Sequence, residues 1–187
     1  GPAAADWLDF MLAGRLPPVG RLALSPMLNE QGGVIGDFSV ARLTETRFQL
    51  TASYAAQAFH RRWFAQHLPD DGGVVIDNLS DDLSGLHIAG PRARDLLARV
   101  VRGDVGSAAL PFMSLAEMDL GVTTARILRV SYTGDLGYEI YVPTAEVVAL
   151  YHEFMAHGGD LGLWPFGTRA LMSLRLEKFF GAWMHEY

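Results

Sequence analysis

The chain has 187 residues, half of them hydrophobic, and a formal net charge of −6. A chain of this length can bury a full core, as one domain or as two small ones. The acidic balance argues against non-specific binding to nucleic acid or to an anionic membrane, and the absence of cysteine excludes disulfides, thiol catalysis and zinc–thiolate sites. No apolar run approaches the roughly 18 residues of a membrane span.

Both ends of the sequence suggest a piece of a longer protein. The chain begins Gly1-Pro2 without an initiator methionine, and its last residues, 183–187, include two aromatic side chains. We therefore expect an excised fragment of a longer polypeptide.

The first half predicts a helix, antiparallel hairpins and a second helix. Gly and Pro clusters separate the periodic segments, with clear turns at 29–33, 44–46 and 69–73. The expected helix, three strands, helix and two further strands lie, in this order, at Ala3–Leu12, Arg21–Met27, Val34–Arg42, Arg47–Ala52, Tyr54–His67, Val74–Asp77 and Gly85–Ile88.

The strand Val34–Arg42 is apolar except for two polar residues on one face. Asp37 and Ser39 alternate with Gly36 and Phe38, so they point to the opposite side of the strand. Because Gly36 has no side chain, another backbone or a flat ligand could approach closely there. Asp37 could hold a proton or stabilise a cation, or it could be an edge-strand residue exposed to water.

The second half repeats the plan of the first. Six residues within 1–14 recur 89 positions later within 90–103, and residues 40–67 overlay 130–157 at an offset of 90 as strand, tight turn, strand and helix. Two unrelated stretches with similar elements are the alternative. The near identity of the two offsets favours duplication of an α+β unit, at about 1–89 and 90–187.

The hairpin Ser131–Pro143 carries a carboxylate in an apolar strand. The turn Gly134–Gly137 precedes Tyr138 and Ile140, which alternate with Glu139 and place it on the opposite face. If that face is exposed, Glu139 is an ordinary solvent-facing residue. If it is covered, the carboxylate needs a partner, and a planar donor edge such as a guanidinium or an aminopyrimidinone would suit it.

The repeat gives Glu139 a counterpart. At the offset of 90, it falls on Gln49. If the two units pack about a pseudo-twofold axis, these side chains could face one shared cavity, and a cleft between similar units is a common ligand site. The predicted fold class is therefore α+β, with two similar units of helix, antiparallel hairpins and helix around a central ligand cleft.

Other signals are weaker. The hydroxyls of Ser131–Thr133 could bind a ligand, although hydroxyls just before a turn usually cap that turn. The segment 166–178 has the apolar spacing of an amphipathic helix. The sequence has no phosphate-binding glycine loop and none of the common hydrolase or zinc-protease spacings.

Four segments together resemble the folate-binding domain of the aminomethyltransferase (glycine-cleavage T-protein) family. They occur in family order over nearly the whole chain, and the similarity is greatest to the branch fused to dimethylglycine and sarcosine dehydrogenases or oxidases. The segments are Pro26–Val40, Gly90–Asp95, Ser131–Ile140 and Ser173–Lys178.

The resemblance implies tetrahydrofolate as the ligand and assigns residues to it. Asp37 matches the functional aspartate of the family and is the implied catalytic residue. Glu139 matches the glutamate that binds the 2-amino group and ring N–H of the pterin. The other implied folate-binding residues are Ser39, Gln49, Ser53 and Tyr132.

The sequence also departs from the family pattern. Many T-proteins have a pair of acids where this chain has Gly36-Asp37, and they carry an arginine where this chain has Leu171. The second difference fits the dehydrogenase branch better than the T-proteins. In that branch FAD is expected only on an upstream flavin domain outside this sequence, and a small barrel domain normally follows.

The implied activity is one-carbon transfer. A flavin domain of the same or a partner chain would oxidise an N-methylated amine, dimethylglycine or sarcosine, and the iminium or formaldehyde would be captured as 5,10-methylenetetrahydrofolate. The alternatives are a folate-dependent methyltransferase or demethylase, and a non-catalytic folate-binding or assembly domain. No metal, nucleic acid or membrane partner is expected, and the expected compartment is a bacterial cytoplasm, or the mitochondrial matrix if the protein is eukaryotic.

Overall fold

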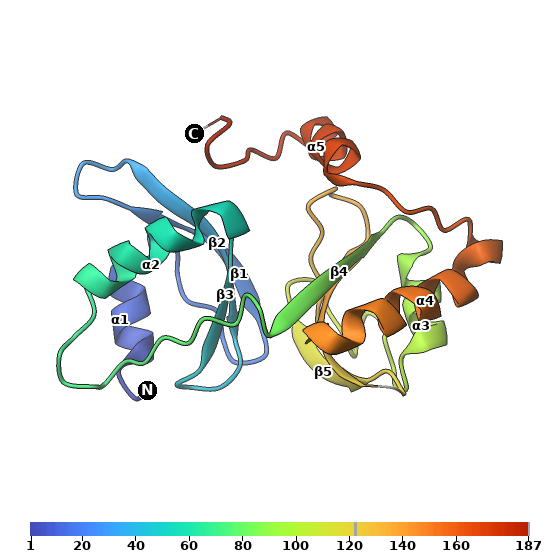
Figure 1. Ribbon diagram of the computed structural model, residues 1–187, viewed down its shortest axis with the longest axis horizontal. Helices are drawn as coiled ribbons and strands as arrows, with labels where there is room; N and C mark the ends of the chain where they lie inside the picture. The colour runs from blue at the N-terminus through green and yellow to red at the C-terminus, as the bar shows by residue number, and fades with distance from the viewer. Residues whose placement is uncertain (122, 187) are drawn as a thin grey trace. The chain divides into compact units, whose positions relative to one another are not determined.

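The computed structural model describes residues 1–121 and 123–186 and shows an α+β protein (Figure 1). The chain forms two compact units. The first contains Gly1–Asn78 and the C-terminal residues from Ala182, and the second contains Leu79–Gly181.

The first unit is a three-stranded antiparallel sheet with two helices. The strand order is β1-β2-β3, which follows the chain. The elements are α1 (Ala4–Met11), β1 (Leu22–Leu28), β2 (Val34–Arg42), β3 (Phe48–Thr51), the short 3₁₀ helix η1 (Tyr54–Ala56) and α2 (Gln57–Gln66).

Both helices of this unit pack on one face of its sheet. Leu8 of α1 and Phe64 of α2 join Phe38 and Val40 of β2 in one buried cluster. The ring centroids of Phe38 and Phe64 lie 5.7 Å apart. Alternation along β2 sends Asp37 to the other face, which these helices do not cover.

The second unit is a four-stranded antiparallel sheet with three longer helices. The strand order is β4-β7-β6-β5, so β7, the last in sequence, lies between β4 and β6. The elements are β4 (Leu83–Ala89), α3 (Ala93–Val100), β5 (Leu115–Asp119), β6 (Thr124–Leu128), β7 (Gly137–Pro143), η2 (Thr144–Glu146), α4 (Val147–Gly158), η3 (Gly159–Leu161) and α5 (Thr168–Glu177).

The core of the second unit lies between its sheet and helices α3 and α4. Tyr138, Ile140 and Val142 of β7 are completely buried, as are Leu97 of α3 and Leu150 of α4. The two helices pack side by side (Figure 1). One face of β7 therefore forms the centre of this core, and the residues between these three point away from it.

The elements recur at the offsets seen in the sequence. Helix α1 at 4–11 corresponds to α3 at 93–100 with an offset of 89, and η1 at 54–56 corresponds to η2 at 144–146 with an offset of 90. The order β1-β2-β3 in the first sheet matches β5-β6-β7 in the second. Strand β4 has no counterpart in the first unit, and a duplication of the unit stays a prediction.

The predicted strand at Val74–Asp77 is wrong. Residues 74–79 form no strand, and Val75 and Ile76 are 67% and 43% exposed. Only Val74 is buried, so the apolar pattern does not mark a strand inside a sheet. The next predicted strand is present as β4, which pairs with β7 from Leu83 to Ala89 and so belongs to the second unit.

The remaining elements expected in the first half are present with shifts of a few residues at their ends. Of the expected hairpin Ser131–Pro143, only the second arm is a strand, β7, because residues 129–136 form a loop that follows β6. The predicted helix Tyr54–His67 begins as the 3₁₀ turn η1 before it becomes α2, and the amphipathic segment 166–178 forms α5. Among the described residues, no helix is both long enough and apolar enough to cross a membrane.

Leu97→Ala should test the core of the second unit. Leu97 is completely buried, so the substitution removes apolar contacts and leaves a cavity, and we expect the free energy of unfolding to fall by about 2–5 kcal/mol. Urea unfolding measures the change. Leu176→Ala on α5 is the matched control because Leu176 is 54% exposed, and an equal loss in both variants would contradict this account of the core.

Candidate functional site

Glu139 occupies the middle of β7, on the face opposite the core. Its directly paired residues are His87 on β4 and Leu128 on β6. Its neighbours along the chain, Tyr138 and Ile140, are completely buried on the other side. The Glu139 side chain is itself only partly exposed. The structure therefore favours a covered carboxylate over the solvent-facing alternative.

Tyr141 holds one oxygen of this carboxylate. Its hydroxyl donates a hydrogen bond of 2.8 Å to Glu139 Oε2. The two residues are two positions apart in one strand and so share a face. The Tyr141 ring lies against Gly85, where an added Cβ would be 3.0 Å from the ring carbon Cε1.

Burial shifts the titration of two facing groups. It raises the pKa of Glu139, and the hydrogen bond from Tyr141 lowers that pKa by a smaller amount. Burial also lowers the pKa of His87. Near neutral pH, His87 is therefore mostly uncharged, and it does not form an ion pair with the carboxylate opposite.

The loop before β7 is tied to His87 through Ser131. The Ser131 hydroxyl lies 3.2 Å from His87 Nε2 and 2.8 Å from Thr133 Oγ1, and it accepts a hydrogen bond of 3.3 Å from the Thr133 backbone N–H. Thr133 is buried, and its hydroxyl accepts a bond of 3.4 Å from the Asp135 N–H. These hydroxyls hold the turn together, as is usual for residues just before a turn.

Tyr132 lies in the same loop and contacts the segment after α5. Its hydroxyl donates a hydrogen bond of 2.8 Å to the carbonyl oxygen of Gly181. Its ring stacks on Phe180, with 6.5 Å between the centroids and 14° between the planes. In this structure the hydroxyl that the sequence assigns to the ligand binds the protein's own backbone.

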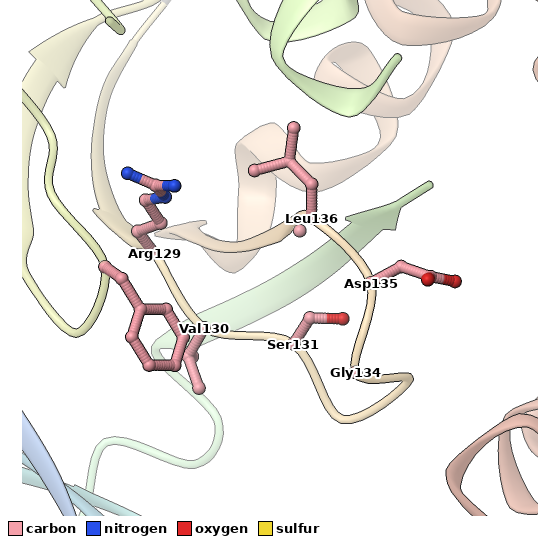
Figure 2. A pocket seen from close by; sticks show the side chains of 8 residues that line it. Arg129, Val130, Ser131, Gly134, Asp135 and Leu136 are labelled. Atoms are coloured by element: carbon pink, nitrogen blue, oxygen red, sulfur yellow. The ribbon is translucent and has the colours of Figure 1, made fainter. Parts of the chain in front are cut away.

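A pocket of about 310 Å³ opens beside this loop (Figure 2). Arg129 and Asp135 line it from opposite sides, and their charged groups point away from each other (Figure 2). Arg129 Nη1 donates a hydrogen bond of 2.9 Å to the Leu110 carbonyl. Of the predicted second-unit site residues, neither Tyr132 nor Glu139 lines the pocket, so it is adjacent to the predicted ligand residues and not formed by them.

In the first unit, three predicted site residues share the sheet face opposite the core. Asp37 and Ser39 are two positions apart on β2, and Gln49 on β3 pairs with Ala41, the next residue on that face. Gln49 Nε2 donates a weak hydrogen bond of 3.5 Å to Thr51 Oγ1. Ser53 is exposed after β3, at the start of η1.

The space beside Gly36 is filled by the protein itself. An added Cβ there would lie 2.5 Å from His60 Nε2, so the imidazole ring packs directly on the glycine. His60 Nε2 is also 3.2 Å from the Ile35 carbonyl oxygen, and burial lowers the pKa of the ring. A core histidine therefore occupies the space beside Gly36, where a backbone or a flat ligand was expected.

The sequence interpretation missed His87, Tyr141 and Gly85 as neighbours of Glu139. The spacing of Tyr141 from Glu139 was a signal, because alternate strand residues share a face. His87 and Gly85 carried no such signal, since only the pairing of β4 with β7 brings them to this face. Among the described residues, no three acidic or histidine side chains are grouped so that they could hold a metal ion.

The raised pKa of Glu139 predicts how stability depends on pH. Above its ordinary pKa of about 4.5, the folded chain binds the Glu139 proton more tightly than the unfolded chain does. This tighter proton binding stabilises the folded chain. The free energy of unfolding should therefore lose that stabilisation as the pH rises from about 4.5 through the raised pKa. Glu139→Gln removes the titrating group, so the variant should gain stability relative to the original chain across this window and keep the gain at higher pH.

Urea unfolding at several pH values measures that difference. Glu177→Gln on α5 is the control for the loss of one negative charge, because Glu177 is exposed. A stability difference between the original chain and Glu139→Gln that does not change with pH would show that Glu139 titrates alike in the folded and unfolded states.

Comparison with known proteins finds curated relatives that are much longer than this chain. It is 33% identical over 177 residues to mitochondrial dimethylglycine dehydrogenase of Homo sapiens, and the match covers 94% of this chain and 20% of that protein. It is 31% identical over 185 residues to the mitochondrial pyruvate dehydrogenase phosphatase regulatory subunit of Mus musculus. That match covers 98% of this chain and 21% of that protein. The chain thus spans about a fifth of the length of each of these two relatives.

A solved structure supports the same assignment. Aminomethyltransferase T of the glycine cleavage system from Bartonella henselae matches with a TM-score of 0.78 and 28% identity, over 97% of this chain and 47% of that one. The predicted α+β fold of T-protein type is confirmed by this match. The profile of the family described as GCVT N-terminal domain matches residues 1–187. The predicted resemblance is thereby confirmed, and the chain belongs to the GCVT N-terminal domain family.

Proposed function

We propose that this chain is a tetrahydrofolate-binding, one-carbon-transfer domain of an enzyme that oxidises N-methylated amines. The observation that carries the proposal is the Glu139 carboxylate, which lies on the sheet face opposite the core with a neutral tyrosine as its hydrogen-bond donor. Relatives named dimethylglycine dehydrogenase and aminomethyltransferase support the reaction class.

The residues around Glu139 fit the pterin of a folate. A half-buried carboxylate is stabilised by N–H donors, and the pterin offers a 2-amino group and a ring N–H on one planar edge. A carboxylate has about four acceptor positions, and Tyr141 takes one of them on Oε2. Glu139 therefore retains acceptor positions on both oxygens for a two-donor ligand.

Asp37 is the proposed acid–base residue. Bound tetrahydrofolate supplies the amine that takes up a one-carbon unit at the oxidation level of formaldehyde. An Asp37 carboxylate stabilises the cationic charge of an iminium and accepts a proton at a carboxylate oxygen as the new bond forms. Ser39 and Gln49, which share its sheet face, are proposed to line the ligand with Ser53 and Tyr132. Glu139 orients the pterin and moves no proton.

The oxidation itself is assigned outside this chain. We propose a flavin domain, in the same or a partner polypeptide, that holds FAD and oxidises dimethylglycine or sarcosine. Relatives about five times longer than this chain leave room for such a domain. The proposed compartment is the cytoplasm of a bacterium or a mitochondrial matrix, which agrees with the mitochondrial relatives.

A second candidate is a non-catalytic folate-binding or assembly domain. The observation that favours it is the relative named as a regulatory subunit, which matches 98% of this chain. A folate-dependent methyltransferase is the third, favoured by the aminomethyltransferase structure. Product analysis separates the two catalytic candidates, because methyl transfer yields 5-methyltetrahydrofolate and capture of an iminium yields 5,10-methylenetetrahydrofolate.

Glu139→Gln should weaken binding of a reduced folate. The substitution removes the charge that accepts the pterin N–H groups, and a hydrogen bond to a charged group contributes about 1.5–3 kcal/mol. We expect a loss of affinity of about tenfold or more by calorimetry on the full-length protein. The control, Glu177→Gln, should bind like the original. Unchanged affinity of Glu139→Gln would remove Glu139 from the site.

Asp37→Asn should separate catalysis from binding. Loss of the proton acceptor is expected to lower folate-dependent product formation by roughly a hundred- to ten-thousandfold. Affinity for the reduced folate should stay close to the original, since Asp37 is not the proposed pterin ligand. Product formation at the original rate would make Asp37 a structural acid, and the second candidate predicts no folate-dependent product in either protein.

A further inference from the structure

Beyond the family residues, the surroundings of Glu139 point to a positioning function. We propose that Tyr141 orients the Glu139 carboxylate for its ligand and that Gly85 is glycine because the Tyr141 ring occupies the space of a side chain there. The identity of the ligand rests on the proposed function. The hydrogen bond and the ring packing do not.

The distance along the strand explains why Tyr141 can reach Glu139. Residues two apart in a strand are about 6.6 Å apart along its axis, and a tyrosine that leans along the strand spans that gap. The 2.8 Å bond to Oε2 fixes the rotation of the carboxyl group about its last bond, which is otherwise soft. Tyr141 therefore determines which way both oxygens face.

Gly85 makes this arrangement possible from the neighbouring strand. Gly85 is directly paired with Tyr141, and an added Cβ would meet the ring carbons at 3.0, 3.3 and 3.7 Å. Gly85 does not have the positive φ that favours glycine, so the backbone accepts alanine at this position. The close approach of the ring, and not the conformation of the strand, favours glycine here.

Groups on the neighbouring strands β4 and β6 share this face with Glu139. His87 faces Glu139 from β4, and burial keeps this imidazole mostly neutral near pH 7. Leu128, which faces it from β6, is apolar. Arg126, also on β6, faces Tyr141 and forms an ion pair of 2.7 Å with Glu117. Tyr141, on the same strand as Glu139, donates the hydrogen bond to its carboxylate.

A ligand-free titration tests the hydrogen bond directly. In Tyr141→Phe the donor is lost, and because that bond lowers the pKa of Glu139, the pKa should rise. Carboxyl ¹³C chemical shifts, followed against pH in the whole chain, report the change. Tyr151→Phe is the matched control, since Tyr151 lies on α4 and is 40% exposed. An unchanged Glu139 titration in Tyr141→Phe would overturn the proposal.

A binding measurement tests the consequence for the ligand. The probe is 5-formyltetrahydrofolate, followed by calorimetry on the full-length protein. Tyr141→Phe should bind it about tenfold more weakly at neutral pH. The difference should grow as the pH falls, because the variant's carboxyl protonates first. A uniform loss at every pH, or no loss, contradicts the positioning role.

Gly85→Ala tests the packing half of the proposal. The added methyl group should displace the Tyr141 ring and reproduce part of the Tyr141→Phe effect on both readouts. In the double variant the two losses should not add, because the alanine acts only through the tyrosine hydroxyl. Gly159→Ala is the control, since an added Cβ there meets no atom within 4 Å. Fully additive losses would overturn the link between Gly85 and Tyr141.

The two readouts distinguish this inference from the proposed function. If the original chain fails to bind the folate while the Glu139 titration shifts as expected, the proposed function fails and the positioning of the carboxylate holds. If the folate binds and the titration does not shift, the proposed function holds and Tyr141 has no positioning role.

Discussion

Each unit buries one face of an antiparallel sheet against its helices, and the remaining features of the chain depend on this one-sided burial. In the second unit, β7 lies between two other strands, with Tyr138, Ile140 and Val142 at the centre of the core. A strand in this position cannot slip by one residue without moving its apolar side chains out of the core. Glu139 and Tyr141 are thereby fixed on the opposite face.

This constraint also sets the chemistry of the candidate site. On the second face the carboxylate meets uncharged neighbours, so its ionised form is poorly solvated and depends on hydrogen-bond donors. Tyr141 supplies one donor, and a ligand with a planar N–H edge would supply more. A group whose charge the fold leaves incompletely stabilised is suited to bind such a ligand. The same strand therefore provides the core and the proposed recognition group.

Prediction from the sequence succeeded where local pattern decides structure. The helix at 4–11 and its counterpart at 93–100 follow from apolar spacing, and the alternation around Asp37 and Glu139 gives their faces. Prediction failed where contacts between residues far apart in the chain decide the structure. Residues 74–77 are apolar enough for a strand, yet no strand forms there. The space beside Gly36 is taken by His60, which no local rule reveals.

The sequence was sufficient to predict the α+β class, the repeated order of elements, the family, and the faces on which Asp37 and Glu139 lie. Each of these follows from residue spacing or from motifs that are contiguous in the chain. The three-dimensional structure was needed to show that β4 joins the second sheet, that His87 faces Glu139, and that the Tyr141 ring lies against Gly85. These contacts join residues that are about fifty or more positions apart in the chain. They are brought together by the pairing of two strands, which depends on the packing of the whole unit.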